Sequence, residues 1–270
     1  MHGLFLDVAG GRVEYEDVPG AGPADDTGVG PAIVMLHEGL GSVGLWRGFH
    51  RDVAAATGRR TVAFSRFGHG RSSAPAQRRP LDFMHAEARE VLPAVLDALG
   101  IDAPILVGHS DGGSIALLAA ASGLPLAGAV VLAPHVFVEE DGLTNIAATR
   151  AAFDGGDLRA RMARHHDDPD VMFGNWVGVW LDPGFRSWDI TAELSTITCR
   201  VLAVQGTADP YGTVAHVEAV RDRSSGPVEI VLLDCGHSPH LERRDETLAA
   251  VTAFVAELSE QRSSPPSAPA

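Results

Sequence analysis

The sequence predicts an α/β fold in which a mostly parallel sheet is covered by helices on both faces. Two observations lead to this prediction. Short apolar runs alternate along the chain with segments of helical periodicity. Most of the runs are apolar almost throughout, as expected of strands that are buried on both sides.

The predicted strands comprise a hairpin and six central runs. The hairpin pairs Leu4–Val8 with Arg12–Asp17 and turns at Gly10-Gly11. The central runs are Ala32–Leu36, Thr61–Ser65, Pro104–Val107, Ala129–Ala133, Arg200–Val204 and Glu229–Leu233.

Helical patterns lie between and after these runs. Ala86–Leu99 carries apolar residues at helical spacing and ends at Gly100, a natural C-cap. Ser114–Ala121 consists of small and apolar residues that suit tight packing under a sheet. Glu246–Leu258 is expected to close the fold.

One long segment interrupts the alternation. Residues 137–196 show no strong strand signal and hold three of the four tryptophans. We therefore predict a helical cap over 137–196, inserted into a core formed by 1–136 and 197–262. The tail 263–270 is predicted to be disordered because it cannot bury enough apolar surface, and Gly20–Gly30 is predicted to be a flexible loop.

Composition narrows the class of protein. With 270 residues and 45% hydrophobic residues, the chain can bury a large core without disulfide or metal support. The formal net charge of −14 argues against nucleic acid or an anionic membrane as a partner. A monomer or homodimer acting on a small molecule is expected.

The cellular location is predicted from three absences. The two cysteines, Cys199 and Cys235, are far apart and fit no metal-ligand spacing, so a reducing compartment is expected. The N-terminus lacks the features of a signal peptide. No run approaches the roughly 18 apolar residues that span a bilayer. We therefore expect a cytoplasmic protein.

A glycine-rich turn follows the third central run. It reads Gly108-His109-Ser110-Asp111-Gly112-Gly113 and leads directly into a predicted helix, the context in which G-x-S-x-G presents a nucleophile. In so sharp a turn the residues two before and two after the serine must lack bulk, as Gly108 and Gly112 do. Amides at the helix start would favour a developing oxyanion. We predict Ser110 as the nucleophile.

A serine hydroxyl is a weak nucleophile and needs a base, which in turn needs an orienting acid. Asp209 lies just past the strand that ends near Val204, and His237 lies just past the strand that ends near Leu233. Both follow Ser110 in the order serine, acid, histidine that accompanies this turn. Each lies at the sheet edge where ligands bind in parallel sheets. We predict these three residues as a catalytic triad.

Nearby residues offer alternatives. Asp234 is a second candidate acid, but it lacks the strand–loop setting of Asp209. His240 is a second candidate base, although its place after a proline favours packing or the substrate pocket. His109 adjoins the nucleophile, where its side chain should point away. The run His165-His166-Asp167-Asp168 suggests a metal, but adjacent side chains do not converge, so a solvated surface is favoured.

The first central run ends in the loop His37-Glu38-Gly39-Leu40-Gly41-Ser42. An oxyanion hole commonly takes one amide from such a loop and another from the residue after the nucleophile. Glycines permit the close backbone approach that such a hole requires. We predict Gly39 or Leu40, together with Asp111, as the donors.

Taken together, these motifs resemble the α/β-hydrolase superfamily over nearly the whole chain. The matching segments are Leu36-His37-Glu38-Gly39, Ser65-Arg66-Phe67-Gly68-His69-Gly70-Arg71-Ser72, the Ser110 turn, the Asp209 loop and Gly236-His237. Size and the single insertion are similar to those of compact esterases, lactonases and carbon–carbon bond hydrolases, including the 3-oxoadipate enol-lactonase group. The resemblance implies a mostly parallel eight-stranded sheet, a small helical cap, and no cofactor or metal.

Two residues depart from the superfamily pattern. Glu38 replaces a glycine that commonly follows the histidine of its loop, and Asp111 stands where a neutral residue is commoner. Both bring acidic groups close to a site that would stabilise an oxyanion. The carboxylates could point outward, pair with Arg66 or a histidine, or bind a polar substrate group. We favour an outward, paired arrangement.

The predicted function is cleavage of a small or medium carboxylic ester or lactone through an acyl-enzyme on Ser110. The same triad also permits carbon–carbon hydrolysis or acyl transfer, and the fold also hosts non-catalytic ligand-binding proteins. A serine argues against haloalkane dehalogenase and epoxide hydrolase chemistry, which resembling enzymes perform with a carboxylate nucleophile. The tentative substrate pocket consists of Glu38, Trp46, His109, Phe137, Trp176, Trp180 and His240.

Overall fold

A single sheet of eight strands runs through the computed structural model, which describes residues 4–21, 30–75 and 77–263. The strands are β1 (Leu4–Val8), β2 (Gly11–Val18), β3 (Ile33–Leu36), β4 (Thr61–Phe64), β5 (Ile105–His109), β6 (Gly128–Leu132), β7 (Val201–Gly206) and β8 (Val228–Leu233). Their spatial order is β1-β2-β4-β3-β5-β6-β7-β8. The pairs β1–β2 and β2–β4 are antiparallel and the other five are parallel. The predicted mostly parallel eight-stranded sheet is confirmed.

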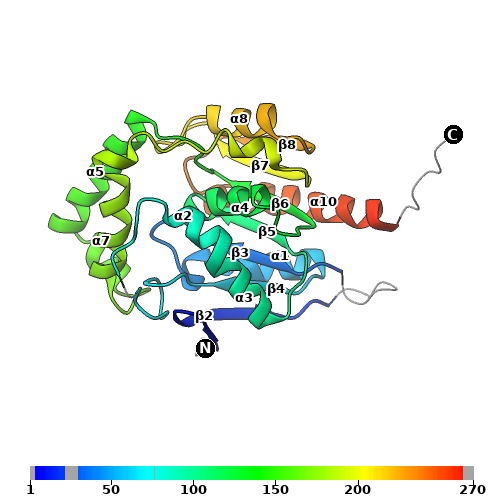
Figure 1. The fold of residues 1–270 in the computed structure, drawn as a ribbon, viewed down its shortest axis with the longest axis horizontal. Helices are drawn as coiled ribbons and strands as arrows, with labels where there is room; N and C mark the ends of the chain where they lie inside the picture. The colour runs from blue at the N-terminus through cyan, green and yellow to red at the C-terminus, as the bar shows by residue number, and fades with distance from the viewer. Residues whose placement is uncertain (1–3, 22–29, 76, 264–270) are drawn as a thin grey trace.

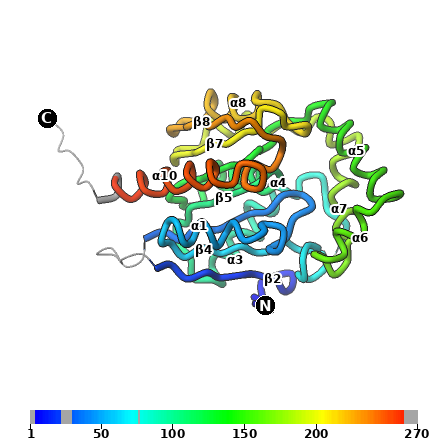
Figure 2. The backbone as a smooth tube through the Cα atoms, turned by 180° about the vertical axis from the view of Figure 1, so that it is seen from behind, coloured from blue at the N-terminus to red at the C-terminus, as the bar shows by residue number. Residues whose placement is uncertain are grey.

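Helices cover both faces of the sheet (Figures 1 and 2). They are α1 (Phe49–Thr57), α2 (Phe83–Ala86), α3 (Leu92–Leu99), α4 (Asp111–Ala121), α5 (Glu140–Gly155), α6 (Leu158–Met162), α7 (Pro169–Trp180), α8 (Ala215–Arg223), α9 (Pro239–Glu242) and α10 (Arg244–Ser263). Helices α1 and α10 pack side by side on one face, whereas α2, α3, α4 and α8 lie on the other.

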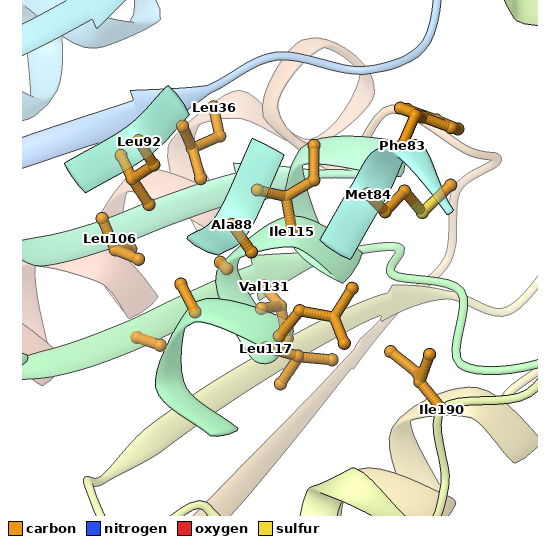
Figure 3. Close-up of a cluster of buried hydrophobic side chains, with 14 of the residues drawn as sticks. Leu36, Phe83, Met84, Ala88, Leu92, Leu106, Ile115, Leu117, Val131 and Ile190 are labelled. Atoms are coloured by element: carbon orange, nitrogen blue, oxygen red, sulfur yellow. The ribbon is translucent and has the colours of Figure 1, made fainter. Parts of the chain in front are cut away.

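The alternation of side chains along the strands builds a core on each face. In β3, Ile33 and Met35 pack on the side of α1 and α10, while Val34 and Leu36 pack on the side of α4. All four are almost completely buried, which explains why the run is apolar throughout. Figure 3 shows the second of these cores, where Leu36, Leu106 and Val131 meet side chains from the covering helices.

Three helices differ in extent from the sequence prediction. Helix α4 begins at Asp111 rather than Ser114, because Ser110 is its N-cap and the glycines after it form the first turn. The helix predicted from Ala86 begins at Phe83 and passes through a π-helical turn at Glu87–Val91 before α3. Helix α10 extends at both ends beyond the predicted Glu246–Leu258.

Helices α5, α6 and α7 all belong to the segment 137–196, together with two 3₁₀ turns, Pro183–Phe185 and Glu193–Thr196. Figure 1 shows α5 and α7 beside each other at one end of the sheet. The division into core and cap stays a prediction. The predicted mobile loop Gly20–Gly30 and tail 263–270 fall largely on residues 22–29 and 264–270, outside the described part, and Ser263 is the last residue of α10.

Within the described ranges, none of the helices has both the length and the apolar character needed to cross a bilayer. Both cysteines are free thiols, Cys235 buried and Cys199 partly so.

Candidate active site

Ser110 occupies a strained turn between β5 and α4. Its φ of 52° and ψ of −119° place a non-glycine residue at positive φ. A Cβ on Gly108 would lie 2.2 Å from the carbonyl oxygen of Gly112, and a Cβ on Gly112 would lie 2.0 Å from that of Leu36. The turn therefore requires glycine at both positions, as the sequence predicted.

The structure brings Ser110, His237 and Asp209 together in one hydrogen-bonded row. His237 Nε2 lies 2.9 Å from Ser110 Oγ and accepts the hydroxyl proton. His237 Nδ1 donates to Asp209 Oδ2 over 2.7 Å. The row comes from the ends of β5, β7 and β8, which share one edge of the sheet.

Asp209 is held rigidly and is ionised. Its Oδ1 accepts the Tyr211 amide at 2.8 Å, and its Oδ2 also accepts Gln205 Nε2 at 2.8 Å. Burial raises the pKa of this carboxyl, but hydrogen bonds and the charge of His237 outweigh it and leave the pKa below its ordinary value. A carboxylate at this place orients the imidazole and supports its positive charge.

The loop after β3 is tied down by its carbonyl groups. His37 Nδ1 and Arg66 donate to the carbonyl of Glu38, His69 Nε2 donates to that of Gly39 at 3.0 Å, and His166 Nε2 donates to that of Leu40 at 3.0 Å. In a trans peptide the N–H points opposite to the preceding C=O. The amides of Gly39 and Leu40 are therefore turned away from these buried side chains.

The amides of Gly39, Leu40 and Asp111 take part in none of the hydrogen bonds found among the described residues. All three residues line the same cavity as Ser110. Gly39 must be glycine, because a Cβ there would lie 2.1 Å from Trp176 Nε1. Free donors at these positions have the arrangement that an oxyanion hole needs.

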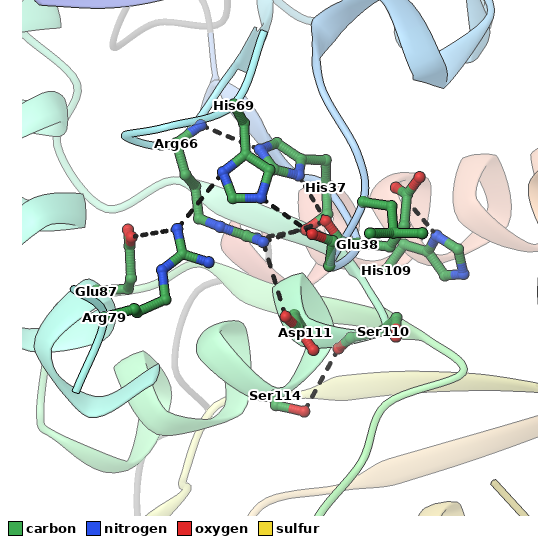
Figure 4. A network of polar contacts seen from close by, with 12 residues as sticks. His37, Glu38, Arg66, His69, Arg79, Glu87, His109, Ser110, Asp111 and Ser114 are labelled. Carbon is green, nitrogen blue, oxygen red and sulfur yellow. Dashed lines mark hydrogen bonds and ion pairs between the residues drawn. The ribbon is translucent and has the colours of Figure 1, made fainter. Parts of the chain in front are cut away.

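Asp111 points into the protein, so its predicted outward orientation is wrong. Its side chain is 1% exposed; Oδ1 accepts Trp180 Nε1 at 3.1 Å and Oδ2 lies 3.9 Å from Arg66 Nη2. Figure 4 shows this carboxyl beside Ser110 and facing Arg66. Burial raises the pKa of Asp111, although Arg66 and Arg79 act in the opposite direction.

Glu38 also faces inward, which again corrects the predicted outward orientation. It lines the cavity, and its Oε2 lies 3.5 Å from His109 Nδ1 (Figure 4). Burial raises the pKa of Glu38, but the hydrogen bond and charge of His109 reverse this and lower it to about 2. Of the arrangements considered, pairing with a histidine holds for Glu38 and pairing with Arg66 for Asp111.

A cavity of about 360 Å³ opens over Ser110. Polar groups line the cavity near Ser110, and α5, α6 and α7 contribute mostly apolar side chains together with Arg161. The lining residues are Glu38, Gly39, Leu40, Leu45, Ser110, Asp111, His135, Ile146, Arg161, Met162, Trp176, Trp180, Tyr211, His237 and Ser238. Glu38, Trp176 and Trp180 are therefore in the predicted pocket.

The other four predicted pocket residues do not line this cavity. Trp46 and His240 are packed against each other and Phe49 in the core on the side of α1. His109 donates through Nε2 to the carbonyl of His237 at 2.7 Å, behind the triad. Phe137 packs against His216 with the two rings tilted, 4.3 Å between ring centroids. Each is an apolar or aromatic side chain whose burial serves packing rather than the cavity.

Several lining residues were missed by sequence reasoning. His135 follows β6 at the same sheet edge as the triad, so the argument that selected Asp209 and His237 could have found it. Tyr211 and Ser238 are close in sequence to triad residues. Ile146, Arg161 and Met162 carry no such signal, because only the packing of α5 and α6 over the sheet brings them to the cavity.

The alternative residues are also placed by the structure. The carboxyl of Asp234 is 92% exposed and lies near Arg243. His166 is buried between the Gly70 amide and the Leu40 carbonyl, so the solvated surface predicted for it is wrong. Asp168 caps α7. In the part of the chain that the structure describes, no three metal-binding side chains converge.

A parallel sheet with a Ser–His–Asp row at its C-terminal edge defines an α/β protein with the arrangement of a hydrolase. Comparison with known protein families is more specific. The chain belongs to the alpha/beta hydrolase family, whose model matches residues 33–251. Its assignment as a hydrolase is thereby confirmed.

Known proteins of three kinds are similar to it. A 2-hydroxy-6-oxo-6-phenylhexa-2,4-dienoate hydrolase from Burkholderia cepacia is 34% identical over 250 residues, covering 82% of this chain and 86% of that protein. An esterase from Exiguobacterium antarcticum superposes with a TM-score of 0.73 at 18% identity, covering 94% and 100% of the two chains. An enol-lactonase from Burkholderia xenovorans LB400 superposes with a TM-score of 0.70 at 19% identity, and again 94% of this chain and 100% of the other are covered.

Proposed function

We propose that this chain is a serine hydrolase that cleaves a small or medium carboxylic ester or lactone through an acyl-enzyme on Ser110. The observation that carries the proposal is the row Ser110–His237–Asp209, with contacts of 2.9 and 2.7 Å. In the first step His237 takes the hydroxyl proton while Ser110 Oγ attacks the carbonyl carbon. The leaving alcohol then receives that proton from His237.

The oxyanion of each tetrahedral intermediate would lie against the amides of Asp111 and of Gly39 or Leu40. These donors are unpaired within the described part of the chain and belong to residues that line the cavity. Other side chains engage the nearby acidic groups: Glu38 Oε2 lies 3.5 Å from His109 Nδ1, and Asp111 accepts Trp180 Nε1 and faces Arg66. Water activated by His237 then releases the acid.

A second candidate reaction, hydrolysis of a carbon–carbon bond, is favoured by the 34% identity to the dienoate hydrolase from Burkholderia cepacia. The same residues would serve, with a carbon leaving group that must receive a proton. The cavity of about 360 Å³, with apolar walls from α5–α7, suits either kind of substrate.

The test has two arms. Replacing Ser110 by alanine should lower turnover by several orders of magnitude and abolish stoichiometric labelling by a fluorophosphonate. Turnover near that of the wild type in the variant would refute the proposal. A panel of short 4-nitrophenyl esters, lactones and vinylogous diketones, compared by kcat/KM, separates ester and lactone hydrolysis from carbon–carbon cleavage.

A further inference from the structure

His135 is a buried imidazole at the wall of the active-site cavity that the triad chemistry does not use. The residue is 5% exposed and lines the cavity beside His237, 5.7 Å between ring centroids. It follows β6, which pairs with both the strand of Ser110 and the strand of Asp209.

The backbone of His135 is fixed to the helix of the nucleophile. Ser114 Oγ accepts the His135 amide at 3.1 Å and donates to the His135 carbonyl at 2.6 Å. Ser114 lies one helical turn after Ser110, to whose carbonyl its amide donates at 3.0 Å. Helix α4 therefore fixes the backbone of His135 as well as that of Ser110.

The ring itself is held on three sides. It meets Trp180 edge to face at 5.1 Å and His216 edge to face at 5.1 Å. A Cβ on Gly212 would lie 3.1 Å from His135 Cε1. These contacts leave the ring little freedom to turn away from the cavity.

The polar groups around the ring are already engaged. Trp180 Nε1 donates to Asp111, while His216 accepts the Val136 amide at Nδ1 and donates to Glu139 at Nε2. Within the described residues, neither ring nitrogen of His135 has a hydrogen-bond partner. His135 lines the cavity, and its ring nitrogens are not among the fully buried polar atoms that lack a partner, so water or a substrate group in the cavity can bond them.

The ring is neutral, which restricts what it can bind. Burial, with the charges of His216, His237 and His109, holds the pKa of His135 well below its ordinary value. A neutral imidazole offers one N–H donor and one nitrogen acceptor. A hydroxyl group matches both, whereas a carboxylate could use only the N–H donor.

We propose that His135 is a specificity-determining residue that hydrogen-bonds an uncharged oxygen, a hydroxyl above all, on the carbon next to the reacting carbonyl. The inference rests on the proposed function, because it takes Ser110 as the reacting centre. A substrate that lacks the oxygen forgoes this hydrogen bond and is disfavoured by the free energy of that one bond.

The kinetic test compares 4-nitrophenyl butanoate with 4-nitrophenyl 2-hydroxybutanoate. We expect the wild type to favour the hydroxylated ester by about tenfold or more in kcat/KM, the effect of one net hydrogen bond. His135→Phe should bring the ratio of kcat/KM for the two esters close to one, whatever its absolute kcat/KM for butanoate. His135→Gln, which retains a donor and an acceptor, should keep part of this preference. His165→Gln, at a residue that does not line the cavity, should keep all of it.

A binding test separates this proposal from the proposed function. In Ser110→Ala, we expect 2-hydroxybutanamide to bind about tenfold or more tightly than butanamide by calorimetry, and His135→Phe in that background to abolish the difference. Equal affinity of the two amides, no binding of either, or a preference that survives His135→Phe would overturn the role of His135. Failure of the serine mechanism is detected separately by the labelling of Ser110.

Discussion

Trp180 Nε1 donates a hydrogen bond of 3.1 Å to Asp111 Oδ1, which joins helix α7 to the residue directly after Ser110. Both residues are almost fully buried. A carboxyl that would otherwise place free negative charge beside an oxyanion is therefore engaged by an indole and faces Arg66. The contact links the helices over the cavity to the catalytic turn.

Replacing Trp180 by phenylalanine should destabilise the protein, because the indole hydrogen bond to a buried carboxyl is lost. We expect the free energy of unfolding to fall by about 1–3 kcal/mol. Urea denaturation measures the change. Trp188→Phe is the matched control: its indole nitrogen is buried without a partner among the described residues, and its ring lies 6.1 Å from that of Trp180. Equal losses in the two variants would contradict a role for the hydrogen bond.

Replacing Gly112 by alanine should disrupt the nucleophile turn. The new Cβ would lie 2.0 Å from the carbonyl oxygen of Leu36, and two segments of backbone would have to move apart. We expect a loss of about 3 kcal/mol or more in the free energy of unfolding. Gly174→Ala in α7, where no atom lies within 4 Å, should instead gain about 0.5–1 kcal/mol. A Gly112→Ala protein as stable as the wild type would show that the turn is looser than described.

Replacing Asp209 by asparagine should lower kcat on the order of 10⁴-fold, because the amide no longer holds His237 in the tautomer that accepts the Ser110 proton. KM should change little, since Asp209 does not line the cavity. Steady-state kinetics measure both constants. Asp234→Asn is the control, since that carboxyl is 92% exposed. If Asp234→Asn were the variant that loses activity, the identity of the acid would be wrong.

Stability should fall as the pH drops below about 6.5, because several histidines are buried in the neutral form. Burial holds the pKa of His37, His69, His135 and His240 well below the ordinary value. Below about pH 6.5 the unfolded chain binds protons that the native protein does not, so each such residue removes about 1.4 kcal/mol per pH unit. The loss continues until the pH reaches the native pKa.

His37 gives the sharpest test of this dependence. Its Nε2 accepts the Arg66 amide at 3.0 Å and its Nδ1 donates to the Glu38 carbonyl at 2.7 Å, so a second proton would set two N–H groups against each other. Between about pH 6.5 and 5, His37→Asn should reduce the slope of unfolding free energy against pH by about 1.4 kcal/mol per pH unit, which corresponds to one proton. Denaturant titrations at several pH values measure the slope. Identical slopes in the variant and the wild type would contradict the assignment.

The apolar runs and the spacing of motifs along the chain were sufficient to predict the sheet and the row of Ser110, Asp209 and His237. A strand buried on both faces must be apolar almost throughout, and the C-terminal ends of parallel strands meet at one edge of the sheet. The same reasoning applied to β6 would have found His135. It failed for Trp46 and His240, because an aromatic side chain near a catalytic loop packs equally well into the core behind that loop.

Local sequence determined the strands, the glycine-dependent turn at Ser110 and the order of the triad, because these depend on steric limits and periodicities within a few residues. Tertiary structure alone decided where Glu38 and Asp111 point and which side chains they contact. It also decided that Ile146, Arg161 and Met162 close the cavity. These outcomes depend on the packing of α5–α7 over the sheet edge, and side chains distant in sequence meet there only once the chain has folded.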